Sequence, residues 1–171
     1  MFNKNIKLVL AAVFVGLAIY QFIESFIGNG ICLLLIAGIF IFLYFKNEII
    51  LLSFLKLRKQ DMDGTNKLLE KIKNPEAALT KKQHGYYNYL KGIILSQTNI
   101  TQAEKFLRKA LKLGLSMDQD IAVAKLNLAG IAMTKRRKRE AQILLNEAKK
   151  LDKYGVLKDQ IVMMKQQMKR I

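Results

Sequence analysis

NLAGIAMTKRRKREAQILLNEAKKLD, residues 127–152, is the most informative segment of this 171-residue chain. It aligns with YLKGIILSQTNITQAEKFLRKALKLG, residues 89–114. Four apolar residues of the earlier segment recur 38 positions later: Ala103, Leu107, Ala110 and Leu113 are matched by Ala141, Leu145, Ala148 and Leu151. Self-similarity at a fixed offset is the signature of a repeat protein, in which each helix pair buries its apolar face against its neighbours.

The spacing of the repeated residues predicts helices. Offsets of four and three place them on one face of a helix, and the chain from Lys46 onward contains a single proline, Pro75. The alanines let a neighbouring helix approach closely, while the leucines fill the groove between units. We therefore expect an all-α repeat domain over residues 48–171, with repeats at about 77–114 and 119–152.

The later repeat has a recognisable order of small and large residues. Leu128-Ala129 are followed by Ala141, Leu145 and Ala148, and then by Leu151-Asp152; the earlier repeat has Gly92, Ala103, Leu107, Ala110 and Leu113. Over about residues 75–152 this order resembles the tetratricopeptide repeat (TPR) family. The chain departs from the family pattern at Lys125, where an aromatic residue is expected, and lacks the closing proline.

The resemblance implies an α-solenoid that binds a protein partner. In this family the contacts come from the first helix of each repeat. The corresponding residues here are Asn88, Leu126, Asn127 and Met133.

Further helices are expected on both sides of the repeats. Leu157, Ile161, Met164, Met168 and Ile171 follow a four-three spacing, which predicts a capping helix within residues 155–171. The methionines could instead mark an adaptable groove for a partner. On the other side, residues 48–57 and 61–73 predict a first helix pair with no flexible linker before it, and Pro75 marks the next boundary.

Two apolar segments precede the repeats. Residues 8–27, LVLAAVFVGLAIYQFIESFI, are long enough as a helix to cross a hydrocarbon core of about 30 Å. Residues 31–45, ICLLLIAGIFIFLYF, are shorter, but the helix can continue past Lys46, whose ammonium group can reach the headgroups. Gly28-Asn29-Gly30 predicts a tight turn between them. We expect a transmembrane hairpin over residues 1–47, and we favour it over a cleaved signal peptide because a second apolar segment follows at once.

The distribution of positive charge predicts the orientation of the hairpin. The chain has 29 Lys and Arg against 13 Asp and Glu, a net charge of 29 − 13 = +16. Lysines precede the first span, and 27 basic and 12 acidic residues follow residue 45, whereas the turn has no basic residue. Because basic residues stay on the cytoplasmic side, we expect both termini there. Frequent Lys, Ile and Asn suggest a bacterial inner (plasma) membrane.

The polar residues of the hairpin have simple explanations. Gln21 and Glu24 are expected at the far headgroup layer, and an intramembrane proton or ion site is the less favoured alternative, since no second charge in either span could complete a relay. Gly16, Cys32 and Gly38 are expected to pack between the two helices.

No catalytic pattern is present in the sequence. It contains no phosphate-binding glycine loop, no nucleophile motif and no metal-ligand spacing, with His84 and Cys32 as the single histidine and cysteine. We therefore expect no enzymatic activity, no cofactor and no metal. Three tyrosines after His84, at Tyr86, Tyr87 and Tyr89, indicate packing between helices or, less favoured, a recognition cluster.

The strongest local signal is a run of five cations, Lys135, Arg136, Arg137, Lys138 and Arg139. The repeat alignment places the run at the turn between the two helices of the later repeat, exposed along one edge. Adjacent like charges repel, so the run is either solvated, laid against anionic lipid, or docked on an acidic partner, a ribosome or RNA.

These observations favour a non-enzymatic, membrane-anchored scaffold that binds a protein partner at the cytoplasmic face. A basic tether for a ribosome, RNA or an anionic lipid surface is the second candidate. An accessory subunit of a membrane transport or secretion complex is the third, and no small-molecule substrate is indicated.

Overall fold

The computed structural model describes residues 4–45 and 48–168, and every regular element in these ranges is an α-helix. The all-helical prediction is thereby confirmed. The helices belong to two compact units, Met1–Gln83 and His84–Ile171. The predicted boundary between residues 47 and 48 falls inside the first unit, so the helix pair that follows the hairpin is grouped with it.

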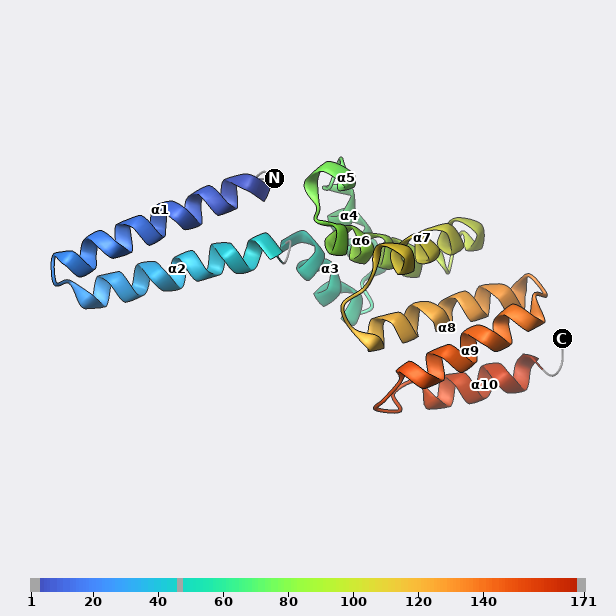
Figure 1. Ribbon diagram of the computed structural model, residues 1–171. Coiled ribbons are helices and arrows are strands. Elements are labelled where there is room, and N and C mark those ends of the chain that lie inside the picture. Colours follow the sequence, from blue (N-terminus) through green and yellow to red (C-terminus); the bar gives the residue numbers. More distant parts are fainter. Residues whose placement is uncertain (1–3, 46–47, 169–171) are drawn as a thin grey trace. The chain divides into compact units, whose positions relative to one another are not determined.

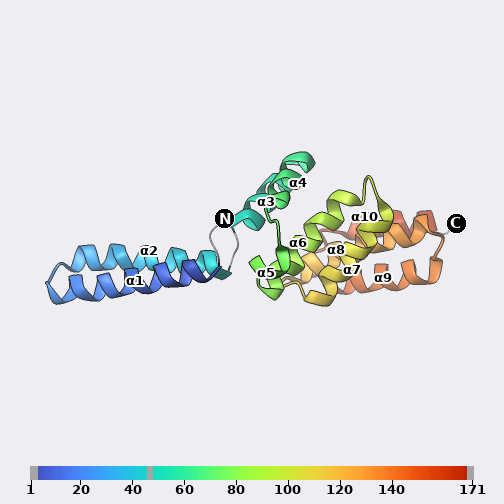
Figure 2. The ribbon, with the colours of Figure 1, turned by 90° about the horizontal axis from the view of Figure 1, so that it is seen from above.

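The first unit begins with an antiparallel hairpin. Helices α1 (Lys4–Ile23) and α2 (Ile27–Phe45) lie side by side in both ribbon views (Figure 1, Figure 2). The turn lies before Ile27, where Ser25 has a φ of 63°. The predicted turn at residues 28–30 is wrong, because these residues belong to the first turn of α2. Gly30 serves close packing instead: a Cβ there would lie 2.7 Å from Cε1 of Phe22.

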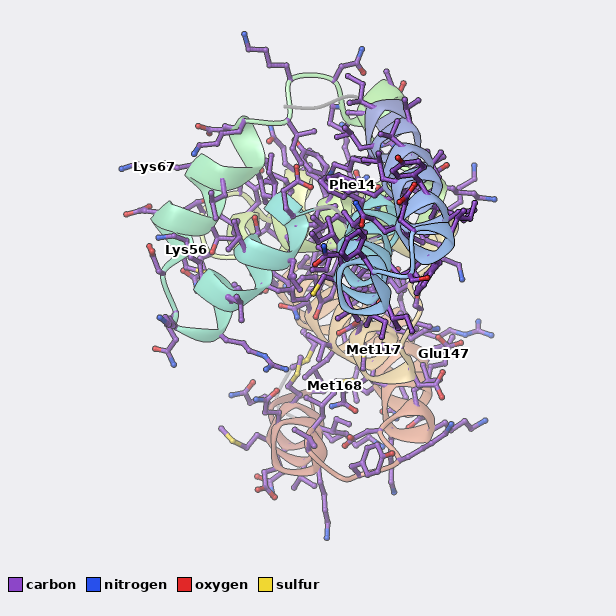
Figure 3. All side chains as sticks on the ribbon, turned by 90° about the vertical axis from the view of Figure 1, so that its left-hand side faces the viewer. Phe14, Lys56, Lys67, Met117, Glu147 and Met168 are labelled. Atoms are coloured by element: carbon purple, nitrogen blue, oxygen red, sulfur yellow. The ribbon has the colours of Figure 1, made fainter. Side chains whose placement is uncertain are left out.

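Small residues seven positions apart form the interface of the hairpin. Ala11 and Ala18 of α1 are buried, as are Gly30 and Ala37 of α2. This spacing keeps one narrow face of each helix against its neighbour. The ring of Phe14, labelled in Figure 3, stacks on a ring of α2 at a centroid distance of 5.5 Å.

The predicted packing residues Gly16, Cys32 and Gly38 do not lie in this interface. All three are exposed, and a Cβ at either glycine would have no neighbour within 4 Å. That prediction was wrong because small residues occur on two faces of each helix, and only the structure shows which face meets the partner helix.

Both hairpin helices are long and apolar enough to cross a membrane. In the windows Ile6–Ile23 and Ile27–Tyr44, only 17% and 11% of the residues are buried, so most of their apolar side chains point outward. The chain therefore has two candidate membrane-spanning helices near its N-terminus. Their positions differ by a few residues from the predicted spans at 8–27 and 31–45, and the predicted continuation through Lys46 lies outside the described residues.

The polar residues Gln21 and Glu24 lie at the turn end of the hairpin. Glu24 is exposed, while the Oε1 atom of Gln21 is buried without a hydrogen-bond partner in the described part of the chain.

Side chains from α1 and α6 complete the end of α2. The last four carbonyl groups of a helix have no partner within it. The Nζ atom of Lys7 lies 3.4 Å from the Leu43 carbonyl oxygen and also forms an ion pair with Glu48. Gln83 Nε2 donates to the Tyr44 carbonyl oxygen at 3.0 Å. Lys7 and Gln83 are both buried, so these contacts are shielded from solvent.

A short helix pair and a single turn of helix complete the first unit. Helices α3 (Glu48–Arg58) and α4 (Met62–Glu70) pack together, as predicted for residues 48–57 and 61–73, and α5 (Pro75–Ala78) follows with its proline at the first position. Asp61 caps α4 by accepting from the Gly64 amide at 2.7 Å. The ammonium of Lys56, labelled in Figure 3, lies 2.7 Å from the same carboxylate and lowers its pKa.

The second unit contains the repeated segments. The helices α6 (Lys81–Leu95), whose first residues belong to the first unit, and α7 (Ile100–Leu113) correspond to the earlier repeat, and α8 (Asp118–Thr134) and α9 (Lys138–Leu151) to the later one. Six residues of the repeated pattern have no exposed surface: Ala103, Leu107, Ala110, Ala141, Leu145 and Ala148.

The last helix, α10 (Lys158–Met168), packs against α8 and α9, and the three lie together in Figure 1. Its buried residues are Ile161 and Met168, with Leu157 just before it, as the predicted capping spacing requires. The last residue of that pattern, Ile171, lies outside the described residues.

Candidate functional site

A groove of about 410 Å³ opens on the second unit between α8 and α10. Helix α8 supplies five of its residues and α10 supplies four, while the turn after α6 and the start of α7 supply one each. The lining residues are Ser96, Ile100, Leu126, Asn127, Gly130, Ile131, Thr134, Gln160, Met163, Met164 and Gln167.

A glycine of α8 faces the end of a methionine side chain of α10 at this point. A Cβ on Gly130 would lie 3.3 Å from the terminal methyl group of Met164. Next to it, the Asn127 side chain donates from Nδ2 to the Val123 carbonyl oxygen at 2.9 Å, a bond within its own helix. Asn127 Oδ1 has no protein donor among the described residues. The groove therefore combines an apolar floor with an amide acceptor.

The α10 wall carries an exposed methionine between glutamines. Met163 is 58% exposed, and Gln160 and Gln167 are exposed on the same wall. Methionine adapts its shape to different apolar neighbours, and primary amides both donate and accept hydrogen bonds. Such a surface can hold an apolar side chain of a peptide and bond to the peptide backbone beside it.

The structure brings together only two of the four predicted partner-binding residues. Leu126 and Asn127 both line the groove. Asn88 is buried, and its Nδ2 donates to the His84 carbonyl oxygen at 2.6 Å; Met133 is buried in the core formed by α8, α9 and α10. The predicted site residues included none from α10; a partner groove formed by the methionines of this segment was only the alternative to a capping helix, and Met164 and Met163 line the groove.

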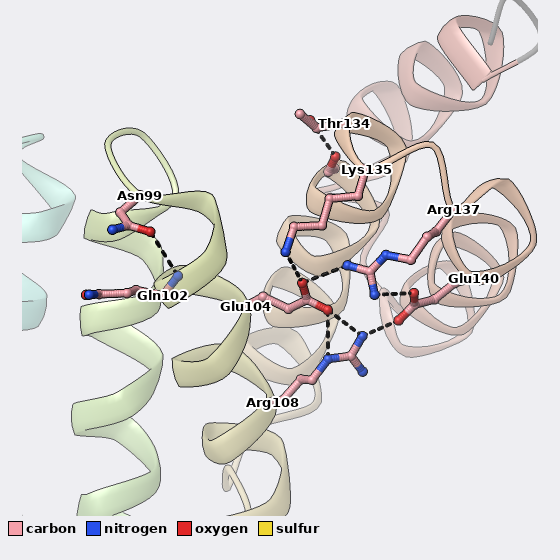
Figure 4. Close-up of polar contacts among 9 residues, drawn as sticks. Asn99, Gln102, Glu104, Arg108, Thr134, Lys135, Arg137 and Glu140 are labelled. Carbon is pink, nitrogen blue, oxygen red and sulfur yellow. Dashed lines mark hydrogen bonds and ion pairs between the residues drawn. The ribbon is translucent and has the colours of Figure 1, made fainter.

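The basic run lies where the repeat alignment placed it, at the turn between α8 and α9. Arg136 has a φ of 57° in this turn, and α9 begins at Lys138. Two of the five cations form ion pairs with Glu104 of α7 (Figure 4). Lys135 Nζ lies 2.8 Å and Arg137 Nη2 lies 2.7 Å from Glu104 Oε2.

Two further residues extend this ion-pair network (Figure 4). Arg108 Nη2 lies 2.8 Å from Glu104 Oε1 and also pairs with Glu140 of α9, whose Oε2 lies 2.9 Å from Arg137 Nη1. The network thus joins α7 to the α8–α9 turn. In the described part of the chain, Arg136, Lys138 and Arg139 are exposed and have no carboxylate partner, whereas Lys135 and Arg137 are paired with Glu104.

The network changes the electrostatics of Glu104. Hydrogen bonds from Arg137, Lys135 and Arg108 hold the pKa of its carboxyl group well below the usual range, although partial burial acts in the opposite direction. The same contacts raise the pKa of Arg137 and Arg108. Glu104, Arg137 and Arg108 therefore stay charged over the physiological pH range.

The tyrosines after His84 take part in packing. Tyr86 donates to Asp120 Oδ2 at 2.8 Å and accepts from the Ser116 amide at 3.2 Å, so it ties α6 to the start of α8. Tyr89 is buried and meets the Tyr86 ring edge-on. Burial raises the pKa of Tyr89, and burial together with the bond to Asp120 raises that of Tyr86.

Within residues 4–45 and 48–168, no three His, Cys, Asp or Glu side chains are grouped so that they could hold a metal ion. Comparison with protein-family models, with curated proteins and with solved structures finds no match to this chain.

Proposed function

We propose that this chain is a non-enzymatic, membrane-anchored adaptor of TPR-like architecture that binds a segment of a protein partner in the groove between α8 and α10. The observation that supports it best is the groove itself, with an apolar floor, adaptable methionines and free amide groups on an otherwise well-packed helical unit. The two apolar helices near the N-terminus supply the anchor, in a bacterial inner membrane with both termini in the cytoplasm.

The chemistry of the groove suggests the chemistry of the partner. The floor and Met163 suit an apolar side chain, while the amides of Asn127 and Gln160 suit the backbone on either side of it. The second unit has 18 basic and 7 acidic residues, a net charge of 18 − 7 = +11. A partner segment with acidic residues around one apolar side chain therefore fits best.

Two neighbouring residues of α10 allow a matched test. Met163 lines the groove, whereas Val162 is exposed on the same helix outside it. In membranes that carry the full chain with a photo-reactive residue at Gln160, a cross-linked partner should be captured by the parent chain and by the variant Val162→Glu. We expect Met163→Glu to abolish capture, because its carboxylate would be placed in the apolar groove and beside an acidic partner. Equal capture by both variants would contradict the proposal.

The second candidate function, a tether for a ribosome or RNA, is supported by the three exposed cations Arg136, Lys138 and Arg139, which are unpaired in the described part of the chain. It loses support from Lys135 and Arg137, because these two are paired with Glu104 inside the unit. We therefore rank it below the protein adaptor.

A further inference from the structure

The turn between α9 and α10 exposes apolar side chains at one end of the second unit. Tyr154 is 88% exposed and Val156 is 68% exposed, although both are large. Figure 1 shows this turn projecting beyond the ends of the two helices. Lys153 pairs with Asp118 at 2.6 Å, which brings the start of α8 and the exposed Met117 to the same end. We name Met117, Tyr154 and Val156 the apolar tip.

The backbone of the turn is fixed by its own residues. The Asp152 carboxylate accepts from the Val156 amide at 3.0 Å and from the Leu157 amide at 2.8 Å. Gly155 has a φ of 69°, a conformation that glycine adopts without strain, and Leu157 is buried in the core. The two exposed side chains are therefore held outward by a preformed turn, and binding does not have to order it.

Lysines flank the turn of the apolar tip along the chain. Lys149 and Lys150 precede it and Lys158 follows it; all three are exposed and have no carboxylate partner in the described part of the chain. The carboxylates of this end are mostly engaged: Asp118 pairs with Lys153, Asp120 accepts from Tyr86, and Asp152 accepts from the turn backbone. Asp159 is the remaining carboxylate beside the turn.

We propose that the apolar tip is a second membrane contact, which inserts into the headgroup layer of an anionic bilayer while Lys149, Lys150 and Lys158 lie against lipid phosphates. The proposal rests on the membrane anchor of the proposed function. A tyrosine ring suits this layer because one end is apolar and the other is hydrated. Lysines next to an anionic leaflet strengthen the contact.

A bilayer fits this surface better than an acidic protein does. The tip consists of a few side chains on a projecting turn, whereas a stable protein interface buries roughly 800 Å² on each partner. A fluid lipid layer can enclose a small projection without a complementary shape.

The chain has no tryptophan, so a single substitution reports directly on the tip. Full-length Tyr154→Trp is reconstituted into phosphatidylcholine vesicles with and without phosphatidylglycerol, using lipids brominated near the headgroup as quenchers. The matched control is Thr98→Trp in the exposed turn between α6 and α7. Glu104 of α7 ties that end to the α8–α9 turn, opposite the tip.

We expect the emission of Trp at position 154 to shift to shorter wavelength and to be quenched in anionic vesicles, with neither change at position 98. Adding Lys149→Gln and Lys150→Gln should weaken insertion of the tip by up to about thirtyfold at low salt, since each basic residue at an anionic surface contributes about fivefold. Emission at position 154 that stays solvent-like, as it would if an acidic protein were the occupant, would overturn the proposal. Quenching unaffected by loss of the lysines would overturn the assignment of anionic lipid.

The same samples distinguish this proposal from the anchor on which it rests. If the chain resists extraction by alkaline carbonate but the tip is not quenched, the second contact is wrong and the anchor stands. If the chain is extracted, the anchor itself is wrong.

Discussion

Glu104 connects the two repeats through ion pairs. Its side chain is only 12% exposed and meets three cations, from its own helix and from the α8–α9 turn (Figure 4). An isolated surface ion pair contributes little, whereas a carboxylate that accepts several charged hydrogen bonds contributes more, and its loss leaves the cations unpaired.

We expect Glu104→Gln to lower the free energy of unfolding by about 1–2 kcal/mol at neutral pH. The matched control is Glu147→Gln, which removes one ion pair with Lys125 on a carboxylate that is 45% exposed and should cost less than about 1 kcal/mol. Urea unfolding of the full chain in detergent, followed by far-ultraviolet circular dichroism, measures both. A cost for Glu104→Gln no larger than for the control would show that the network adds nothing.

The pKa of Glu104 predicts a pH dependence of stability. Its folded-state pKa lies below the ordinary value of 4.5, so the stabilisation is present in full above that value and is lost as the pH falls toward the folded-state pKa. Between about pH 7 and about pH 3, the urea midpoint of the parent chain should therefore fall further than that of Glu104→Gln. Parallel decreases in the two proteins would contradict the assignment.

This residue also shows a limit of prediction from the sequence. The alignment located the basic run correctly at the α8–α9 turn, because the repeat offset fixes where a turn must lie. The alignment could not show that Glu104 forms ion pairs with two of the five cations. These cations are 31 and 33 residues away from Glu104 in the sequence, and nothing in the local pattern links them to it.

At the level of helices, the two repeats differ in how tightly they pack at equivalent glycines. Gly92 and Gly130 are 38 positions apart, the repeat offset. A Cβ on Gly92 would lie 2.6 Å from Cγ of the buried Leu107 and 3.2 Å from its backbone nitrogen. At Gly130 the nearest atom is the flexible end of Met164, at 3.3 Å. Gly92 is therefore required for the close contact between α6 and α7, whereas the structure leaves space for a methyl group at Gly130.

We expect Gly92→Ala to destabilise the protein by about 1–3 kcal/mol, because the added methyl group has no room. Gly130→Ala should be neutral or stabilising by up to about 1 kcal/mol, because alanine favours the helix and Met164 can move. Thermal unfolding of the full chain in detergent compares the two variants directly. Equal destabilisation would contradict the difference in packing between the repeats.

The helices themselves were largely predictable, but the position of the hairpin turn was not. The four-three spacing of Leu107 and Leu145 from the nearby alanines predicts both a helix and the face of that helix that is buried. Both repeated segments could therefore be located from the sequence. The hairpin turn was misplaced because glycine has two uses. Gly30 allows Phe22 to pack closely, whereas the left-handed residue of the turn is Ser25, and composition alone does not separate these roles.

For the molecule as a whole, the charge distribution predicts an arrangement that cysteine labelling can test. Cys32 is the single cysteine, so a Cys32→Ser background is free of thiols. In intact cells, a membrane-impermeant maleimide should label Ser25→Cys in the hairpin turn. Thr98→Cys, in the turn after α6, should react only after permeabilisation, because basic residues keep that side in the cytoplasm. Labelling of both positions from one side would exclude a spanning hairpin.

The candidate site was only partly predictable because it combines residues from three regions of the chain. Leu126 and Asn127 follow from the repeat pattern. Met163 and Gln160 belong to the capping helix, whose apolar spacing explains its buried face but does not show that its other face borders a groove.

The contacts that complete α2 have a consequence for the order of events during synthesis. The Leu43 carbonyl lies near Lys7, which is synthesised before α2, but the Tyr44 carbonyl accepts from Gln83, 39 residues further along the chain. The bond between Gln83 and the Tyr44 carbonyl can therefore form only after translation has reached the first turn of α6.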